Sequence, residues 1–360
     1  MASYEAVAGE VRQQIGSPLP ANPRTVFDTL SFDREKVRWE DYLFAPTPVE
    51  LVRNSDGREC LFKRDDYFAP LGYHGINGSK LRQAIYLFKK YAAGKRRVIN
   101  GTSVHSPQLP MCSALARHYG LKCTCVLGGT KPATFRRNEM ADIAASLGSE
   151  FDFINIGYNH NIQLRCQELL KQSPEDAFYL EYGITLDHNR HAPEEIVQFH
   201  IVGAEQVKNI PPHITDLVMA AGSCNSCTSV LLGLAHYGTG IKRVHLVGTG
   251  PSKIPYLTER LELMGSVLGE ELDIYDGLPY ALQFPKTRPI QAIFYDLHGE
   301  KYCRYEDEMR FDFGGIDLHP TYEGKVMSYI YEKRPELINS NTLFWIVGNR
   351  PQKEVILSHV

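Results

Sequence analysis

Two hydrophobic patterns alternate along the chain from about residue 60 onward. Short continuous apolar runs are followed by longer segments in which apolar residues recur every three or four positions. Continuous runs are typical of strands covered on both faces, and the 3.6-residue spacing indicates helices. The predicted strands are 96–100, 122–129, 176–183, 216–222, 243–250 and 342–348. The predicted helices are 79–94, 141–148, 162–172 and 194–207. This order predicts an α/β fold with parallel sheets covered by helices.

Two segments lie outside the alternation. Residues 1–45 are rich in Pro, Arg and acidic residues, and we expect an irregular N-terminal extension. In 292–306, the polar turn HGEK separates two aromatic-rich arms, which predicts an inserted β-hairpin. A chain of 360 residues is too long for one ordinary core, so we expect two lobes.

Composition and charge narrow the function classes. The formal net charge is −3, so no global field attracts nucleic acid or an anionic membrane. The first 16 residues carry charges where a signal peptide needs an apolar run, and no apolar stretch is long enough to span a bilayer. Eight scattered cysteines are typical of reduced thiols in a cytoplasmic protein. Cys224 and Cys227 form a CxxC without a second ligand pair, so we predict no metal site.

A lysine at a predicted helix start is the first candidate for chemistry. Gly72, Gly75 and Gly78 precede a helix that opens with Ser79 and Lys80. A lysine approached through a glycine turn can be buried against a cofactor more easily than one on a helix face. The alternative is a capped helix with a solvated lysine.

Two polar loops between a strand and a helix could bind anions. Ser106 and Gln108 precede a helix whose first turn holds Pro110, a place suited to a carboxylate. Gly222 and Ser223 end an apolar strand, and small residues continue to the next helix. Such a loop aims N–H groups and hydroxyls at one point, as a phosphate cradle does. An ordinary N-cap and a tight structural turn are the alternatives.

A fourth candidate lies near the C-terminus. Tyr322 and Glu323 precede Gly324 at a predicted helix start. By itself, a carboxylate there is most simply a stabilising first-turn charge.

Together, the four features resemble a known family. Their order is TPVEL (47–51), KRDD (63–66), the glycine turn with Lys80, Ser-x-Gln, the small-residue loop and PTYEGK (320–325). This order resembles the aminocyclopropane-carboxylate deaminase and D-cysteine desulfhydrase family of fold-type II pyridoxal-phosphate (PLP) enzymes. The resemblance covers about residues 46–349. It implies a two-lobed, tryptophan-synthase-β-like fold with PLP between the lobes.

The resemblance also implies roles for individual residues. Lys80 would hold PLP as a Schiff base, and Glu323 would face the pyridine nitrogen. Tyr322 and Ser106 would be catalytic, with Ser106, Gln108 and Tyr280 contacting substrate. The phosphate loop would consist of Gly222, Ser223, Cys224, Asn225 and Ser226.

Several positions depart from the family pattern. Ser79 stands where the family has Asn, and Gln83 replaces a basic residue. Pro107 replaces the asparagine that contacts the PLP 3′-oxygen, and Cys224 and Asn225 replace two glycines. The cofactor and fold therefore carry over better than the substrate.

The function implied is a PLP-dependent lyase or deaminase acting on a small amino acid or related amine through a carbanion. One alternative is a PLP-dependent decarboxylase or lyase whose amino acid is attached to a larger carrier such as a modified nucleobase. A second is a non-catalytic scaffold of the same fold. A Rossmann-type oxidoreductase is the alternative fold, but GTGPSK (248–253) lacks the third glycine and the acidic residue of that motif.

The resemblance divides the chain as well. It implies a large PLP-binding domain of residues 1–82 and 192–360 and a small substrate domain of residues 83–191. A homodimer is expected on the same basis, whereas the cytoplasmic location is expected from the cysteines.

Overall fold

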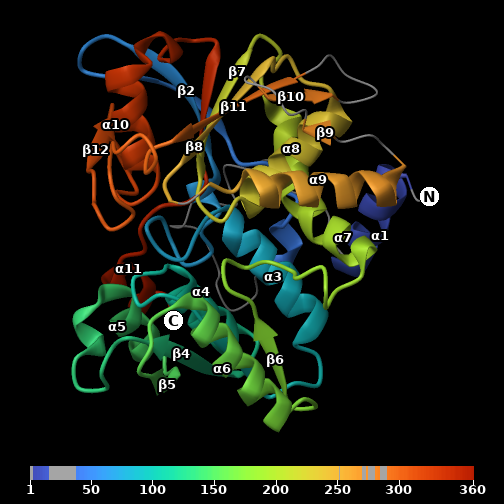
Figure 1. Ribbon diagram of the computed structural model, residues 1–360, viewed down its shortest axis with the longest axis vertical. Coiled ribbons are helices and arrows are strands. Elements are labelled where there is room, and N and C mark those ends of the chain that lie inside the picture. The colour runs from blue at the N-terminus through green and yellow to red at the C-terminus, as the bar shows by residue number, and fades with distance from the viewer. Residues whose placement is uncertain (1–2, 16–37, 251, 270–272, 275–279, 284–289) are drawn as a thin grey trace.

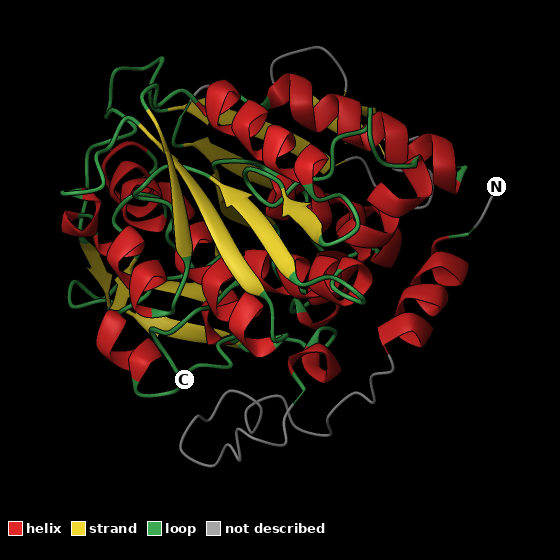
Figure 2. Ribbon diagram, turned by 90° about the horizontal axis from the view of Figure 1, so that it is seen from below, coloured by secondary structure: helices red, strands yellow, loops and turns green. Residues whose placement is uncertain are grey.

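The computed structural model describes residues 3–15, 38–250, 252–269, 273–274, 280–283 and 290–360. Two separate twisted sheets, each with helices on its faces, form the body of the molecule (Figures 1 and 2). β12 (Phe311–Phe313) and β13 (Ile316–Leu318) form a separate antiparallel ribbon of two strands. The fold is the tryptophan-synthase-β-like α/β fold that the sequence predicts.

The larger sheet combines a parallel centre with antiparallel edges. The strands at its centre, from β2 to β11, pair in parallel, whereas β1, β10 and β9 pair antiparallel to their neighbours. In spatial order the strands are β1 (Val49–Arg53), β2 (Glu59–Arg64), β14 (Thr342–Ile346), β7 (Asp216–Ala221), β8 (Arg243–Gly248), β11 (Ile290–Asp296), β10 (Tyr280–Gln283) and β9 (Asp273–Ile274).

The smaller sheet is wholly parallel. Its order is β5 (Glu150–Ile154), β4 (Lys122–Gly128), β3 (Arg97–Gly101) and β6 (Ala177–Leu180). Ile99 and Val126 face α6 (Asn159–Gln172), and neighbouring Val98 and Leu127 belong to the core on the other face. Alternate residues of each strand thus enter two different cores, as covered strands require.

The same alternation divides the core of the larger sheet. In β7, Leu217 and Met219 join the core that contains α3, α7, α8 and α9, whereas Val218 and Ala220 pack with α10. The helices are α1 (Tyr4–Ile15), α3 (Ser79–Tyr91), α4 (Gln108–His118), α5 (Glu139–Ser146), α7 (Pro193–Ala204), α8 (Asn225–Tyr237), α9 (Ile254–Leu268), α10 (Glu323–Lys333) and α11 (Lys353–Leu357). Short 3-10 turns are η1 (Trp39–Tyr42), η2 (Asp65–Tyr67), η3 (Phe135–Arg137), η4 (Glu205–Asn209) and η5 (Pro335–Leu337).

All six predicted strands and four predicted helices are present, but two predictions about the remaining segments are wrong. Residues 4–15 are not irregular. They form α1, where Tyr4 is 1% exposed and stacks on His236. The hairpin predicted for 292–306 does not form, because β11 pairs in parallel with β8 and turns follow it. Its aromatic arm finds a partner that is distant in sequence, which local pattern does not reveal.

The predicted domain boundaries stay a prediction. All four strands of the smaller sheet lie between residues 97 and 180. The boundary between 82 and 83, however, falls inside the continuous helix α3. Within the described ranges, no helix has the length and apolar character needed to cross a membrane.

Candidate active site

The carboxyl ends of parallel strands from both sheets meet at one cleft. Two adjoining cavities of about 80 and 350 Å³ lie there. They share six lining residues, which come from segments far apart in the sequence: Lys80, Ser106, Gln108, Gly222, Ser223 and Tyr322. Ligands of open α/β sheets bind outside the carboxyl ends of their strands, so this cleft is the candidate active site.

The end of β14 positions the start of helix α3. Gly78 has φ +94°, and a Cβ there would lie 2.3 Å from the Val347 carbonyl oxygen. The Ser79 N–H donates to that same oxygen at 2.8 Å. Only a glycine allows this close approach with this backbone angle. The contact fixes the first turn of α3 and places Lys80 in the wall of both cavities.

The KRDD segment (63–66) contacts this helix start through Asp65. Asp65 is buried and accepts hydrogen bonds from the Ser79 hydroxyl, the Trp345 indole (2.9 Å) and the Thr47 hydroxyl (2.6 Å). Ser79 therefore has a defined structural partner although it departs from the family pattern. We conclude that this motif holds Lys80 in place.

The Lys80 amine faces the cavity without a partner. Within the described part of the chain, no hydrogen bond or ion pair engages its Nζ. Burial lowers the pKa of Lys80, and the nearby Glu323 carboxylate opposes this shift. A neutral amine is the nucleophilic form, so both features suit an amine that reacts with a carbonyl group.

Glu323 lines the smaller cavity at the start of α10. Its Oε1 accepts a hydrogen bond from the Val347 N–H at 3.1 Å. The side chain is 1% exposed, and burial raises the pKa of the carboxyl to about 8. Val347, the residue directly after β14, thus contacts both Glu323 and the helix that carries Lys80.

Tyr322 lies against the phosphate-loop candidate. The Gly222 Cα hydrogen points at its ring, since a Cβ there would lie 3.5 Å from Tyr322 Cε1. Its hydroxyl contacts the Tyr305 hydroxyl at 3.1 Å, and burial raises the pKa of Tyr322 well above its usual value. Lys325 donates to the carbonyl oxygens of Arg304 and Tyr305 and so fixes the loop that carries this second tyrosine.

The loop from Gly222 to Ser226 joins β7 to the N-terminus of α8. Cys224 has φ +63° at the N-cap position, so the loop turns in a left-handed conformation. The side chain of Asn225 is occupied, because its amide donates to the carbonyl oxygens of Gly183 and Ile184 and accepts from the Tyr256 hydroxyl. Within the described residues, the Ser223 and Ser226 hydroxyls have no hydrogen-bond partner, and both residues line the smaller cavity beside the N–H groups that a helix start leaves unpaired.

Ser106 and Gln108 have different environments at the start of α4. The Ser106 hydroxyl accepts from the Gln108 N–H at 3.2 Å and remains in the cavity wall. The Gln108 amide donates to Asn100 (2.9 Å) and to the Glu181 carbonyl (2.8 Å), and its Oε1 accepts from the Gly183 N–H (2.8 Å). Gln108 therefore has no side-chain hydrogen left for a substrate carboxylate. In this structure it positions the loop that follows β6.

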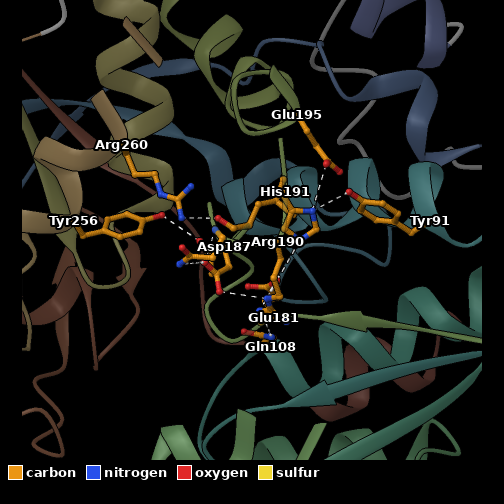
Figure 3. A network of polar contacts seen from close by, with 12 residues as sticks. Tyr91, Gln108, Glu181, Asp187, Arg190, His191, Glu195, Tyr256 and Arg260 are labelled. Atoms are coloured by element: carbon orange, nitrogen blue, oxygen red, sulfur yellow. Dashed lines mark hydrogen bonds and ion pairs between the residues drawn. The ribbon is translucent and has the colours of Figure 1, made fainter. Parts of the chain in front are cut away.

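A polar network holds that loop in place (Figure 3). Glu181 accepts from Arg190 at 2.7 Å and contacts His191 at 3.2 Å. Arg260 of α9 donates to the Leu186 carbonyl. Hydrogen bonds thus tie this loop to Gln108 of α4 on one side and to Arg260 of α9 on the other.

The comparisons with known proteins agree on one class. The chain is 45% identical to "O-seryl-dTMP PLP-dependent decarboxylase" of Salmonella phage ViI, over 92% of this chain and 88% of that protein. No protein-family model matches it. Its structure resembles a homologue of ACC deaminase, with TM-score 0.64, 19% identity and coverage of 88% and 94% of the two chains.

More distant structures share the fold. Diaminopropionate ammonia lyase of Escherichia coli matches with TM-score 0.55 at 15% identity, covering 98% of this chain and 92% of the other. Threonine deaminase isoform 2 of Solanum lycopersicum matches with TM-score 0.55 at 13% identity, covering 96% and 95%. The chain belongs to the fold-type II PLP-dependent enzymes. Its cofactor is pyridoxal 5′-phosphate.

The site of this PLP enzyme fits the cofactor. The smaller cavity presents an unpartnered amine at Lys80, a buried carboxyl at Glu323 and the N-terminus of α8, where Ser223 and Ser226 lie. The amine matches the aldehyde of PLP, and the buried carboxyl matches its pyridine nitrogen. The helix N-terminus matches its phosphate. PLP, when bound, supplies an aldehyde that condenses with amines and a ring that accepts electrons from a bond at the α-carbon. The role of each residue toward PLP remains our proposal.

Sequence reasoning missed several residues of the PLP enzyme's cleft. His319 lines the smaller cavity, Tyr182 and Thr249 line the larger one, and Tyr305 contacts Tyr322. Thr249 stands in GTGPSK (248–253), which was considered only as a dinucleotide-binding motif, and His319 directly precedes PTYEGK (320–325). Thr249 and Tyr182 lie at the carboxyl ends of the predicted strands 243–250 and 176–183, and this position is the signal that the sequence provides for them. Tyr280 lies in β10, and its side chain lies outside the described part of the structure.

Proposed function

We propose that this PLP enzyme is a decarboxylase whose amino-acid substrate is attached to a nucleotide. The first substrate to test is an O-seryl group on thymidylate. The observation that carries this proposal is the 45% identity, over most of both chains, to a protein described as an O-seryl-dTMP decarboxylase. The 350 Å³ cavity beside the PLP cavity supports it, because a free small amino acid needs no such space.

The reaction exchanges a carboxylate for a proton. The bond between the α-carbon and the carboxylate carbon breaks, CO2 leaves, and the electron pair left on the α-carbon takes up one proton. The rest of the substrate, including the oxygen link between the amino acid and the nucleotide, stays intact. No oxidant or reductant is needed.

The chain's own residues would bind and orient the substrate for this reaction. The Ser106 hydroxyl and the first turn of α4 would hold the carboxylate. Lys80 carries an amine whose pKa is lowered by burial, and Tyr322 carries a phenol whose pKa is raised by burial. Near neutral pH the Tyr322 hydroxyl thus keeps its proton and can donate it toward the α-carbon.

A lyase or deaminase acting on a free small amino acid is the second candidate. The same lysine, tyrosine and carboxyl would serve that chemistry, and the solved structures of similar fold include two ammonia-releasing enzymes. At 13–15% identity these structures carry the fold alone, so the decarboxylase is the better supported proposal.

The test is a direct product assay on the PLP-loaded protein. O-seryl-thymidylate labelled in its carboxyl carbon should release labelled CO2, and in D2O the product should carry one deuterium at the former α-carbon. Lys80→Ala should reduce release to background. Release of ammonia with a keto acid from a free amino acid, and no CO2 from the seryl nucleotide, would reject the proposal in favour of the lyase.

A further inference from the structure

The walls of the larger cavity are polar but carry no acidic side chain among the described residues. Lys253 supplies a positive charge to a wall that otherwise carries hydroxyl and amide groups and the Lys80 amine, which we assign to PLP. A third cavity of about 350 Å³ opens beside the same cleft and differs in charge. Glu139, Glu306 and Glu308 line that third cavity, and two of these glutamates pair with Arg350. An anionic ligand is therefore favoured in the larger cavity and disfavoured in the third.

Two buried hydroxyl groups in the larger cavity have no hydrogen-bond partner. Thr249 is 2% exposed and Thr102 is 1% exposed, and the Oγ1 atom of each is unpaired among the described residues. A buried polar group that lacks a partner costs free energy unless a ligand or water satisfies it. These two side chains come from opposite sheets, after β8 and β3, so their hydroxyls flank the cleft.

Thr249 and Lys253 also lie in the segment that leads from β8 to the N-terminus of α9. Thr249 directly follows β8, and Lys253 is the N-cap residue of the 15-residue helix α9. Lys253 makes no ion pair within the described residues. The positive end of a helix, an unpaired lysine and an unpaired buried hydroxyl together form a site for a phosphate.

We propose that the larger cavity is a nucleotide subsite in which Lys253 and Thr249 bind a phosphate of the carrier thymidylate. It is separate from the cradle at the start of α8, which we assign to the phosphate of PLP. Each anion thus has its own helix, α9 for the substrate and α8 for the cofactor. The inference rests on the proposed function, because it names the part of the substrate that reaches beyond PLP.

The aromatic side chains of the same cavity suit the rest of a nucleotide. Tyr182 and Tyr305 line it, and tyrosine rings stack on pyrimidine bases. Tyr256 is already engaged, since its hydroxyl bonds to Asn225 and contacts Thr185 at 3.2 Å. It supports the wall between the two helix N-termini.

The test compares thymidine monophosphate with thymidine on the PLP-loaded protein by calorimetry at low salt. Wild-type protein should bind the monophosphate more tightly than the nucleoside. Lys253→Gln should weaken monophosphate binding about ten- to hundredfold, as loss of a charged hydrogen bond does, and leave thymidine binding unchanged. Thr249→Val should weaken it by a smaller factor. Lys242→Gln is the matched control, because Lys242 is exposed just before β8, at the opposite end of that strand.

Three outcomes would overturn the subsite: no preference of the wild type for the monophosphate, equal binding by Lys253→Gln, or loss of PLP from Lys253→Gln. The last would assign this lysine to the cofactor phosphate.

A short oligothymidylate distinguishes a free nucleotide from one within a strand. Lys253-dependent binding of the oligomer would support a phosphodiester ligand, and Lys253-dependent binding of the monophosphate alone would support a free one. If binding depends on Lys253 but no CO2 is released from the seryl nucleotide, the reaction is rejected and the subsite stands.

Discussion

At the scale of a residue, Glu323 shows how burial sets the protonation of a site. Burial raises the pKa of its carboxyl from 4.5 to about 8. Between these two pH values, the carboxyl of the folded PLP-free protein is therefore protonated, whereas that of the unfolded chain is ionised. The resulting stabilisation is complete below about pH 4.5 and is lost as the pH rises toward 8. Glu323→Gln removes this dependence, because the amide does not ionise.

We accordingly predict that the stability advantage of Glu323→Gln over the wild type grows with pH. In the PLP-free proteins it should rise by at least about 1 kcal/mol between pH 5 and 8, measured by urea denaturation. The lowered pKa of Lys80 acts in the opposite direction but is present in both proteins, so the difference reports mainly on Glu323. A difference that does not change with pH would show that the carboxyl is already ionised in this range.

At the scale of an element, the contact between β14 and the start of α3 determines where Lys80 lies. We predict that Gly78→Ala displaces this helix start, because its Cβ would lie 2.3 Å from the Val347 carbonyl oxygen. The variant should fold less stably and lose most of its bound PLP, measured as cofactor absorbance per chain. PLP is lost because the Lys80 amine is displaced, although the lysine itself is still present.

Gly94→Ala is the matched control for this variant. Gly94 also has a positive φ, +74°, but its Cβ would have no neighbour within 4 Å. It should lose about 1–2 kcal/mol through backbone strain alone and keep its PLP. Equal PLP loss in both variants would contradict a specific role for the β14 contact.

At the scale of the whole molecule, PLP should connect the two sheets. We propose that it binds between a large domain, residues 1–82 and 192–360, and a small domain, residues 83–191, and that the enzyme is a homodimer. Adding PLP to the PLP-free protein should slow backbone hydrogen exchange in 222–226 of the larger sheet and in 102–108 of the smaller one. Mass spectrometry of peptides from both regions measures this. Protection confined to one sheet would contradict binding between them.

The sequence by itself determined six buried strands, four helices and the order of the site segments. Continuous apolar runs predicted β3, β4, β6, β7, β8 and β14, because strands covered on both faces are made mainly of apolar residues. The motif order predicted that Lys80, Gly222 and Glu323 would converge, and all three line the smaller cavity. These features depend on local periodicity or on motifs, which a single chain displays directly.

Only the tertiary structure decided which polar groups remain free for ligands. Gln108 and Asn225 looked like binding residues, yet their amides are bonded to the loop 181–184. Thr249 and Thr102 looked ordinary, yet their hydroxyls are buried and unpaired beside the cofactor cavity. A side chain's hydrogen-bonding capacity is known from its type, but its partners are set by segments up to hundreds of residues away. The pairing of β11 with β8, in place of a local hairpin, has the same cause.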